Sequence, residues 1–269
     1  MSVTNTNIIV NKFELCLTNT YLLNNRMRHL EFKLLSDKPL NYIAGQFVSL
    51  LIENNSKIIR RNFSIANSPS NTYQIEIAAT FVPNGIASTT LWNMKIGDHI
   101  NASGPFGIFV LPPDDFIGIK RYILVATGTG VTPYRAMLQS IKLRLDKANM
   151  DNIEFILLLG VRDRYELLYA EDFINFAARY PNFKFIACYS RENQNNHHNT
   201  DNHEQTQPNN KQEYFGYVQN KLIELNLKPE TDVVYLCGNP DMIDQSVIIL
   251  EKFNIPRNNI KREKYISSK

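Results

Sequence analysis

The stretch Val125-Ala126-Thr127-Gly128-Thr129-Gly130-Val131-Thr132-Pro133 joins an apolar strand to a helix and decides the fold of the second half of the chain. Its glycines would let the backbone approach a phosphate, Thr132 could cap the helix, and Pro133 suits a first helical turn, where an amide donor would be unpaired. A diphosphate could rest on this helix N-terminus. The turn can equally be a plain strand–helix connection, because it lacks the Gly-x-Gly-x-x-Gly spacing of the dinucleotide fingerprint.

The alternation of apolar strands and helix-length segments extends from about residue 112 towards the C-terminus. Strands are predicted at 121–126, 153–160, 183–189 and 232–237, and helices at 133–147, 170–179, 217–225 and 241–253. Near-continuous apolar strands separated by helices indicate a parallel sheet that is covered on both faces. An α/β domain is therefore expected in this half.

Residues 8 to 103 follow a period of two instead. Leu30, Phe32 and Leu34 alternate with charged residues, as they would in a strand with one buried face. Only 86–94 is predicted to be helical in this half. The pattern predicts an antiparallel β-barrel with one helix.

Length and composition fit two ordinary domains, since 269 residues with 43% hydrophobic and 20% charged side chains can bury two cores. We place the boundary near 112–120, which gives a barrel domain at 1–115 and an α/β domain at 116–269. The net charge of +3 is too small to indicate a nucleic-acid partner, but it permits docking of an acidic protein.

Membrane and secretion signals are not visible in the sequence. No apolar run approaches the roughly 20 residues of a membrane span, and the N-terminus lacks the basic and apolar regions of a secretion signal. The three cysteines, an odd number, also argue against a disulfide framework. A cytoplasmic protein without membrane contact is expected.

A metal site is not expected either. Cys16, Cys188 and Cys237 lack the close spacing that ligates zinc or an iron–sulfur cluster, so any redox centre must be a bound organic cofactor. The segment 192–212 is rich in Asn, Gln and His and is predicted to be a mobile surface loop. Its histidines are His197, His198 and His203. They could hold a metal, but without a rigid frame they are better explained as solvated loop residues.

Two further segments could bind a ligand. In 85–90, hydroxyl groups cluster at the start of the predicted barrel helix, which favours a phosphate site, with plain capping by Ser88 as the alternative. The segment 60–67 combines cationic, aromatic and hydroxyl side chains on one extended stretch. A bend could gather them around a flat ligand, although an ordinary strand has the same pattern.

Four motifs occur together in a fixed order. They are Arg61-Asn62-Phe63-Ser64, Gly104-Pro105-Phe106-Gly107, Gly128-Thr129-Gly130-Val131-Thr132-Pro133 and Cys237-Gly238-Asn239-Pro240-Asp241-Met242-Ile243. In this order and spacing they resemble the ferredoxin–NADP reductase family of flavoproteins. The resemblance extends from about residue 8 to 266 and implies one FAD and one nicotinamide dinucleotide.

The resemblance assigns the FAD contacts residue by residue. Arg61 would pair with the pyrophosphate, Phe63 would stack on the isoalloxazine ring, and Ser64 would hydrogen-bond near flavin N5. Phe63 replaces the usual Tyr and keeps its stacking face. The other residues implied in FAD binding are Asn62, without an assigned contact, Ile77 and Ala78 through their backbone, and Gly85, Ser88 and Thr89 at the phosphates.

The resemblance also implies a binding site for the second dinucleotide. The residues that would receive it are Gly128, Thr129, Gly130 and Thr132, with Cys237 and Gly238 beside the nicotinamide. A buried structural thiol is the alternative for Cys237. Ser190 and Arg191 resemble the segment that binds a 2′-phosphate, and Tyr217 could stack on adenine, which favours NADPH over NADH. Ser-Arg after a strand can also be only a turn.

The segment Glu263-Lys264-Tyr265 resembles the end of the family's sequences, where an acidic residue lies near the flavin and an aromatic residue covers it. Plant-type members end on the aromatic residue, whereas Ile266-Ser267-Ser268-Lys269 follows here. An edge strand with an exposed Tyr265 is the alternative.

The function that the resemblance implies is electron transfer between NADPH and a one-electron carrier, with ferredoxin or flavodoxin preferred, by a monomer. Ser64, Cys237 and Glu263 are the catalytic candidates. Other acceptors remain open, namely an oxygenase component, free flavin or a quinone. A non-catalytic, flavin-bearing subunit of a complex is the alternative of a different class.

Overall fold

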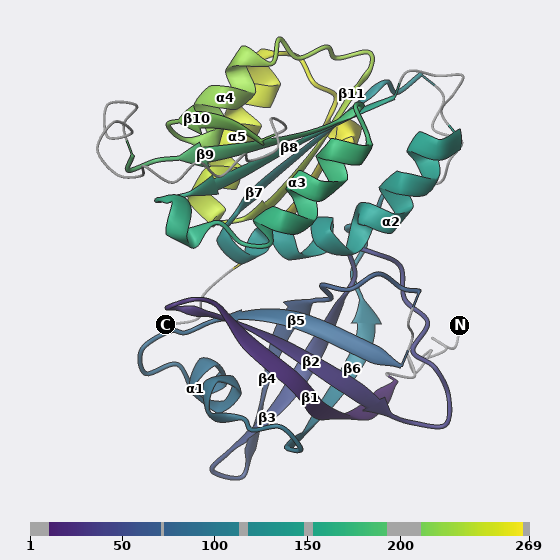
Figure 1. Ribbon diagram of the computed structural model, residues 1–269, viewed down its shortest axis with the longest axis vertical. Coiled ribbons are helices and arrows are strands. Elements are labelled where there is room, and N and C mark those ends of the chain that lie inside the picture. Colours follow the sequence, from purple (N-terminus) through teal and green to yellow (C-terminus); the bar gives the residue numbers. More distant parts are fainter. Residues whose placement is uncertain (1–10, 71–72, 113–117, 148–152, 193–210, 266–269) are drawn as a thin grey trace, which may run out of the picture.

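The structure is a computed structural model that describes residues 11–70, 73–112, 118–147, 153–192 and 211–265. Within these residues the chain forms two six-stranded sheets, one antiparallel and one parallel. Figure 1 shows the antiparallel domain below the α/β domain along the longest axis of the molecule. The predicted fold class is confirmed.

The N-terminal domain is an antiparallel barrel with the strand order β4-β3-β6-β1-β2-β5. Its elements are β1 (Lys12–Asn24), β2 (Met27–Leu35), β3 (Phe47–Asn54), β4 (Lys57–Ser64), β5 (Gln74–Thr80), α1 (Ile86–Asn93) and β6 (His99–Phe106). The alternation in β2 buries Leu30 and Phe32 completely, as a period of two requires. Beyond β4, the Ala66 amide donates to the Glu76 carbonyl and joins the two outer strands.

The C-terminal domain is a parallel sheet with the order β10-β9-β8-β7-β11-β12. Its strands are β7 (Arg121–Thr127), β8 (Glu154–Val161), β9 (Phe183–Tyr189), β10 (Lys211–Phe215), β11 (Asp232–Gly238) and β12 (Ile260–Lys264). Its helices are α2 (Thr132–Lys147), α3 (Ala170–Arg179), α4 (Val218–Glu224) and α5 (Pro240–Lys252), with short 3-10 turns η1 (Gly128–Val131), η2 (Arg164–Glu166) and η4 (Arg257–Asn259).

Helices cover both faces of this sheet. In β7, Tyr122 and Leu124 pack into the core under α2 and α3, whereas Ile123 and Val125 pack into the core under α4 and α5. The strand is therefore buried on both sides, which explains its continuous apolar sequence.

The chain reverses its direction across the sheet between β7 and β11. Strands β8, β9 and β10 follow β7 on one side, and β11 and β12 lie on the other. Ligands of open α/β sheets bind beyond the carboxyl ends of the strands at such a switch point. This position is occupied by η1 and by the start of α5, so the fold alone indicates where a nucleotide could bind.

Three sequence predictions are corrected. The predicted loop 192–212 ends earlier, because Lys211 and Gln212 already belong to β10, which pairs in parallel with β9. The structure does not describe 193–210, so the predicted mobile loop and its three histidines lie outside the described residues. Thr132 does not cap a helix, since η1 continues directly into α2 and the Thr132 hydroxyl has no hydrogen-bond partner among the described residues.

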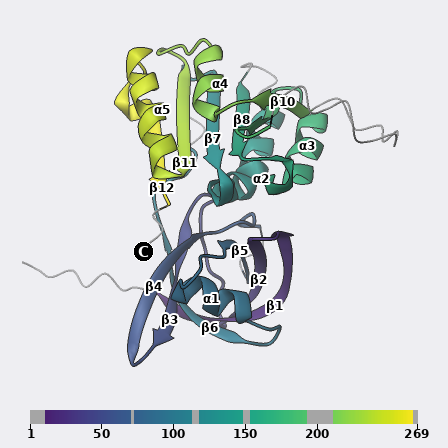
Figure 2. The same ribbon diagram turned by 90° about the vertical axis from the view of Figure 1, so that its left-hand side faces the viewer.

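The third correction concerns the alternative given for the C-terminus, an edge strand with an exposed Tyr265. An edge strand is present, but β12 ends at Lys264, and Tyr265 lies beyond it, partly buried rather than exposed. Figure 2 shows β12 on the side of the α/β domain that faces the barrel. The Tyr265 amide donates to the Gly238 carbonyl and fixes this segment against the end of β11.

The predicted domain boundary after residue 115 falls among residues that the structure does not describe, between β6 and β7. In the described part of the chain, no helix combines the length and the apolar character needed to cross a membrane.

Candidate functional site

Two of the cavities near the domain interface contain predicted site residues. The first, which we call the interdomain cavity, has a volume of about 600 Å³. It is lined by residues 60–64 of β4, 78–80 of β5, 84–88 at the start of α1, Thr129 and Thr132 of the turn, 263–265 at the C-terminus, and Phe47 and Val82. Segments separated by more than 200 positions in the sequence therefore line one cavity.

All four residues of the Arg61–Ser64 motif line this cavity. Successive side chains of a strand point to opposite faces of the sheet. Because β4 is the outermost strand, side chains on both of its faces can border the same cavity. Asn62 has a structural contact that the sequence did not predict, since its side-chain oxygen accepts a hydrogen bond from Ser49 Oγ at 2.6 Å. This bond ties β4 to β3.

Ser64 joins the barrel to the C-terminal segment. Its hydroxyl donates to Glu263 Oε1 at 3.1 Å and accepts a bond from the Tyr265 hydroxyl at 2.5 Å. Burial raises the pKa of the Glu263 carboxyl, and the bond from Ser64 opposes this shift. Within the described residues no cation pairs with Glu263, so this carboxyl can hold a proton closer to neutral pH than an exposed one.

Cys237 lines neither cavity. It is completely buried in the core next to Tyr265. Burial, together with the nearby Glu263 charge, raises the pKa of the Cys237 thiol well above its usual value. The thiol is therefore protonated at neutral pH and is not poised as a nucleophile.

The start of α1 forms another wall of the interdomain cavity. Gly85 is the N-cap residue and supplies no side-chain cap, which leaves the first helical amides open to a ligand. Ser88 lines the cavity, but its hydroxyl lies 2.8 Å from the Val82 carbonyl and 3.0 Å from the Gly85 carbonyl. Thr89 is exposed and does not line the interdomain cavity, and the Ile77 side chain is buried in the barrel core, so that only its backbone could contact a ligand.

The residues present fit FAD. The Thr132 hydroxyl is buried at the cavity wall and has no hydrogen-bond partner among the described residues. A buried hydroxyl without a partner costs free energy unless a ligand or water satisfies it. The open amides of α1 and the cation of Arg61 would suit a pyrophosphate, and the aromatic residues Phe63 and Tyr265 line the same cavity, where they would suit a flat heterocycle.

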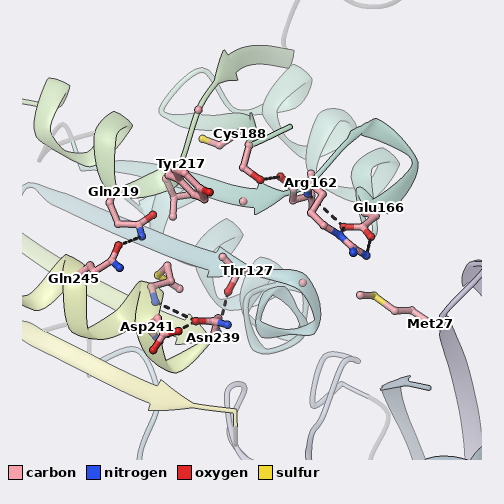
Figure 3. Close-up of a pocket in the computed structure, with 17 residues that line it drawn as sticks. Met27, Thr127, Arg162, Glu166, Cys188, Tyr217, Gln219, Asn239, Asp241 and Gln245 are labelled. Atoms are coloured by element: carbon pink, nitrogen blue, oxygen red, sulfur yellow. Dashed lines mark hydrogen bonds and ion pairs between the residues drawn. The ribbon is translucent and has the colours of Figure 1, made fainter. Parts of the chain in front are cut away.

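The second cavity, which we call the sheet-edge cavity, has a volume of about 560 Å³ and lies at the switch point of the parallel sheet (Figure 3). It is lined by Thr127, Gly128, Gly160, Val161, Arg162, Glu166, Cys188, Ser190, Gly216, Tyr217, Val218, Gln219, Asn239, Asp241, Met242 and Gln245, and by Met27 from the barrel. Most of these residues follow the carboxyl ends of β7, β8, β9 and β11, where nucleotides bind.

The turn η1 separates the two cavities. Gly128 lines the sheet-edge cavity and Thr129 lines the interdomain cavity. Gly130 is buried between them and lines neither. A Cβ atom at Gly130 would lie 2.3 Å from the Cys237 carbonyl oxygen, so glycine is needed here for packing against β11 rather than for approach to a phosphate.

Two comparisons of sequence bear on the family. An Oxidoreductase FAD-binding domain model matches residues 14–111, and an Oxidoreductase NAD-binding domain model matches residues 124–247. The flavodoxin/ferredoxin–NADP reductase of Buchnera aphidicola subsp. Schizaphis graminum is 30% identical over 240 residues, which cover 82% of this chain and 84% of that protein. The chain belongs to the ferredoxin–NADP reductase family.

Some other proteins similar to this chain are longer than it. The reductase component of phenol 2-monooxygenase from a Pseudomonas species is 28% identical over 234 residues, covering 86% of this chain and 60% of that protein. The chain spans 60–62% of the length of this and two further relatives. The solved ferredoxin–NADP reductase of Neisseria gonorrhoeae has a TM-score of 0.73 at 19% identity, with 95% of this chain and 98% of that chain covered.

Within this family fold, the predicted dinucleotide residues are divided between the cavities. Gly128, Ser190 and Tyr217 line the sheet-edge cavity, and Thr129 and Thr132 line the interdomain cavity. The remaining predicted residues line neither, namely Gly130, Arg191, Cys237 and Gly238. Ser190 Oγ donates to the Val161 carbonyl at 3.2 Å, which orients the residue at the end of β9. Tyr217 is 62% exposed, so its ring is free to stack on a ligand.

Sequence reasoning missed several residues of the sheet-edge cavity. Arg162 and Glu166 follow β8 and form an ion pair there. Gln219 donates to Gln245 at 2.7 Å, while its own oxygen is buried without a partner among the described residues. Arg162 could have been found, because it follows the predicted strand 153–160 just as Ser190 follows 183–189. Gln219 and Gln245 meet only through the packing of α4 on α5.

Gln219 also provides the test of fit for a dinucleotide. Its unpaired oxygen is the acceptor that an amine or hydroxyl of a ligand would satisfy. The residues present therefore fit a nucleotide. A metal site finds no support in the described segments, where no group of three or more His, Cys, Asp and Glu side chains could hold an ion.

Proposed function

We propose that the protein is an FAD-dependent oxidoreductase that transfers electrons between NADPH and a one-electron carrier. The observation that carries this proposal is the interdomain cavity, where Phe63 and Ser64 of β4 meet Glu263 and Tyr265 of the C-terminus above the turn η1. Bound FAD would supply the exchange between two-electron and one-electron chemistry.

The chain's own residues would position the reacting groups. Phe63 and Tyr265 would enclose the flavin ring and exclude water from it. The Ser64 hydroxyl is held by two bonds, so its orientation is set before any ligand binds. The raised pKa of Glu263 would let this carboxyl hold a proton at Oε1 next to Ser64.

The preference for NADPH over NADH rests on the sheet-edge cavity. Arg162 lines it beside Ser190, and the exposed Arg191 lies at the end of the same strand as Ser190. A 2′-phosphate needs such cations and hydroxyl donors. Tyr217 would stack on the adenine.

Ferredoxin or flavodoxin is the carrier that we favour. The Buchnera relative is named as a reductase of these carriers and matches most of this chain. The exposed Arg60 at the wall of the interdomain cavity would attract an acidic protein. A second candidate is electron supply to an oxygenase component, because the phenol 2-monooxygenase relative carries out that role by name.

The test is the visible spectrum of the purified protein, followed by anaerobic reduction of its flavin with NADPH and with NADH. We expect a yellow protein whose flavin is reduced faster by NADPH. A colourless protein that takes up no added FAD would contradict the proposal, and bound flavin that neither nucleotide reduces would favour a non-catalytic subunit. Reduction of ferredoxin or flavodoxin, compared with that of an oxygenase component, then separates the two carriers.

A further inference from the structure

Arg162 and Glu166 form a two-pronged ion pair inside the sheet-edge cavity. Arg162 Nε lies 2.9 Å from Glu166 Oε2, and Arg162 Nη2 donates to Glu166 Oε1. The Arg162 amide lies 3.3 Å from the same carboxylate. Figure 3 shows the two side chains turned toward each other. Paired bonds of this kind are the strongest that an arginine makes with a carboxylate.

The local sequence builds this pair. Asp163 caps η2 by accepting from the Tyr165 amide at 3.0 Å, and the Glu166 amide donates to the Asp163 carbonyl. This tight turn folds Glu166 back onto the residue four positions earlier. Glu166 is only 17% exposed in its side chain, so it is held in place rather than swinging in solvent.

The pair cancels the cation that the cavity offers. Among the described residues that line it, Arg162 is the one cation, and Glu166 and Asp241 are the acidic groups. The hydrogen bonds from Arg162 lower the pKa of Glu166, and the nearby charge of Arg26 from the barrel lowers it further, so Glu166 is ionised at neutral pH. A phosphate that enters the cavity therefore meets a neutralised arginine.

We propose that Glu166 is a specificity-determining residue, which limits the preference for NADPH over NADH by competing with the ribose 2′-phosphate for Arg162. The inference rests on the proposed function, because it requires that the sheet-edge cavity receive the adenosine end of the dinucleotide. The 2′-phosphate is the one group that NADPH has and NADH lacks, and it adds roughly −1.5 to −2 charges at neutral pH. A carboxylate on Arg162 therefore penalises NADPH alone.

The test is Glu166→Gln in the FAD-loaded protein, with 2′-AMP and 5′-AMP as probes in calorimetric titrations. Glutamine can still accept a bond from Arg162 but carries no charge. We expect 2′-AMP to bind about five- to tenfold more tightly to the variant, with 5′-AMP changed less than about twofold. The ratio of kcat/KM for NADPH to that for NADH should rise by the same factor, and the gain should shrink as salt is added.

Glu154→Gln is the matched control. Glu154 pairs with Lys184 at the beginning of β8 and β9, whereas Arg162 and Ser190 follow the ends of these strands. The substitution Glu154→Gln removes one carboxylate from the same two strands at the opposite edge of the sheet. It should leave the affinities for 2′-AMP and 5′-AMP unchanged. Glu166→Ala provides a second variant if Glu166→Gln folds poorly, and should change the 2′-AMP affinity in the same direction.

The outcomes separate the two proposals. Unchanged or weaker 2′-AMP binding to Glu166→Gln, with normal 5′-AMP binding, would overturn the role of Glu166 and leave the proposed function intact. If neither nucleotide binds to either protein, the role of Glu166 fails, whereas the proposed function is decided separately by whether NADPH or NADH reduces the bound flavin.

Discussion

Two carboxyl groups at the domain interface have opposite pKa shifts. Glu263 lies on the side of the interdomain cavity, where burial raises its pKa and its described partner is the Ser64 hydroxyl. Glu76 lies on the outer side of the interface. Burial opposes ionisation there too, but the His29 ring, whose Nε2 lies 3.4 Å from Glu76 Oε2, and the hydrogen bond from Arg135 outweigh it and lower the pKa of Glu76.

Glu76 belongs to a polar network between the two domains. Arg135 of α2 bonds Glu76 at 2.6 Å and Asp172 at 2.7 Å, which joins the barrel to α2 and α3. The buried His29 ring contacts the Tyr169 hydroxyl at 2.8 Å across the same interface. We name Glu76, His29, Arg135, Tyr169 and Asp172 the outer junction, and Ser64, Glu263 and Tyr265 the inner junction.

The difference between the outer and the inner junction indicates that the two have different roles. The outer junction pairs its charges and so holds the domains together. In the inner junction, the Glu263 carboxyl has no cation as a partner among the described residues, and the Ser64 hydroxyl bridges it to Tyr265 beside the interdomain cavity. Groups with shifted pKa values beside a cavity are typical of reactive sites. Changes in the outer junction should therefore affect stability, and changes in the inner junction should affect reactivity.

The largest effect is expected for Arg135→Gln. The substitution leaves Glu76 and Asp172 without their cation in a partly buried place, and should cost about 2 kcal/mol of unfolding free energy, since Arg135 retains some solvent. Urea denaturation of the FAD-loaded protein measures it. Arg257→Gln is the control, because Arg257 is 91% exposed and lies 3.9 Å from its partner. Equal stability of the two variants would contradict the role of the outer junction.

Ser64→Ala should slow flavin reduction by NADPH by roughly 10- to 100-fold while FAD remains bound, because it removes the group that the inner junction positions. Anaerobic stopped-flow absorbance measures the rate. Ser49→Ala is a matched control, since Ser49 is equally buried on the neighbouring strand but bonds Asn62 instead. Normal reduction in Ser64→Ala would remove the assigned role of this hydroxyl.

The pH dependence of stability should differ in sign between the two carboxyl groups. Both have a usual pKa near 4.5. The contribution of Glu76 is present above that pH and is lost as the pH falls through its lowered folded-state pKa. That of Glu263 is present below that pH and is lost as the pH rises through its raised folded-state pKa, with a slope of at most about 1.4 kcal/mol per pH unit.

Urea denaturation of wild type, Glu76→Gln and Glu263→Gln between pH 3 and 8 measures these slopes. As the pH rises, the unfolding free energy of the wild type should increase relative to that of Glu76→Gln. It should decrease relative to that of Glu263→Gln. Slopes of the same sign would show that the two junctions are not electrostatically distinct.

The smallest effects are expected from two matched tyrosine variants. Tyr169→Phe and Tyr265→Phe each remove one hydroxyl bond between the domains, worth about 1 kcal/mol. Only Tyr265→Phe should also slow flavin reduction, by a few-fold, because its hydroxyl holds Ser64. Equal slowing in both variants would contradict the division between the junctions.

The fold could be predicted well from the sequence where a single periodicity dominates. The predictions 183–189 and 170–179 coincide with β9 and α3, because their apolar patterns match the faces that the domain buries. The turn η1 was missed, since a 3-10 turn and a helix cap have the same local composition. The reason for Gly130 was also hidden, because the carbonyl it must approach lies more than 100 residues later, at Cys237.

The site was less accessible to local patterns. Glu263 and Tyr265 were selected only because the chain resembles a known family, and the segment 60–67 gave no indication that Ser64 would meet them about 200 positions later. No spacing rule connects such distant groups. Arg162 was missed because its partner Glu166 makes the pair resemble an ordinary surface helix contact.

The turn η1 is the thin wall between the sheet-edge cavity and the interdomain cavity. One residue, Gly128, faces the sheet-edge cavity, and the next, Thr129, faces the interdomain cavity. A ligand in one cavity that moved η1 would change the shape of the other cavity. The free-energy coupling between ligands in the two cavities would be the same in both directions. With Gly130 packed against the backbone at Cys237, such a movement would also involve β11 and the Tyr265 segment anchored to its end.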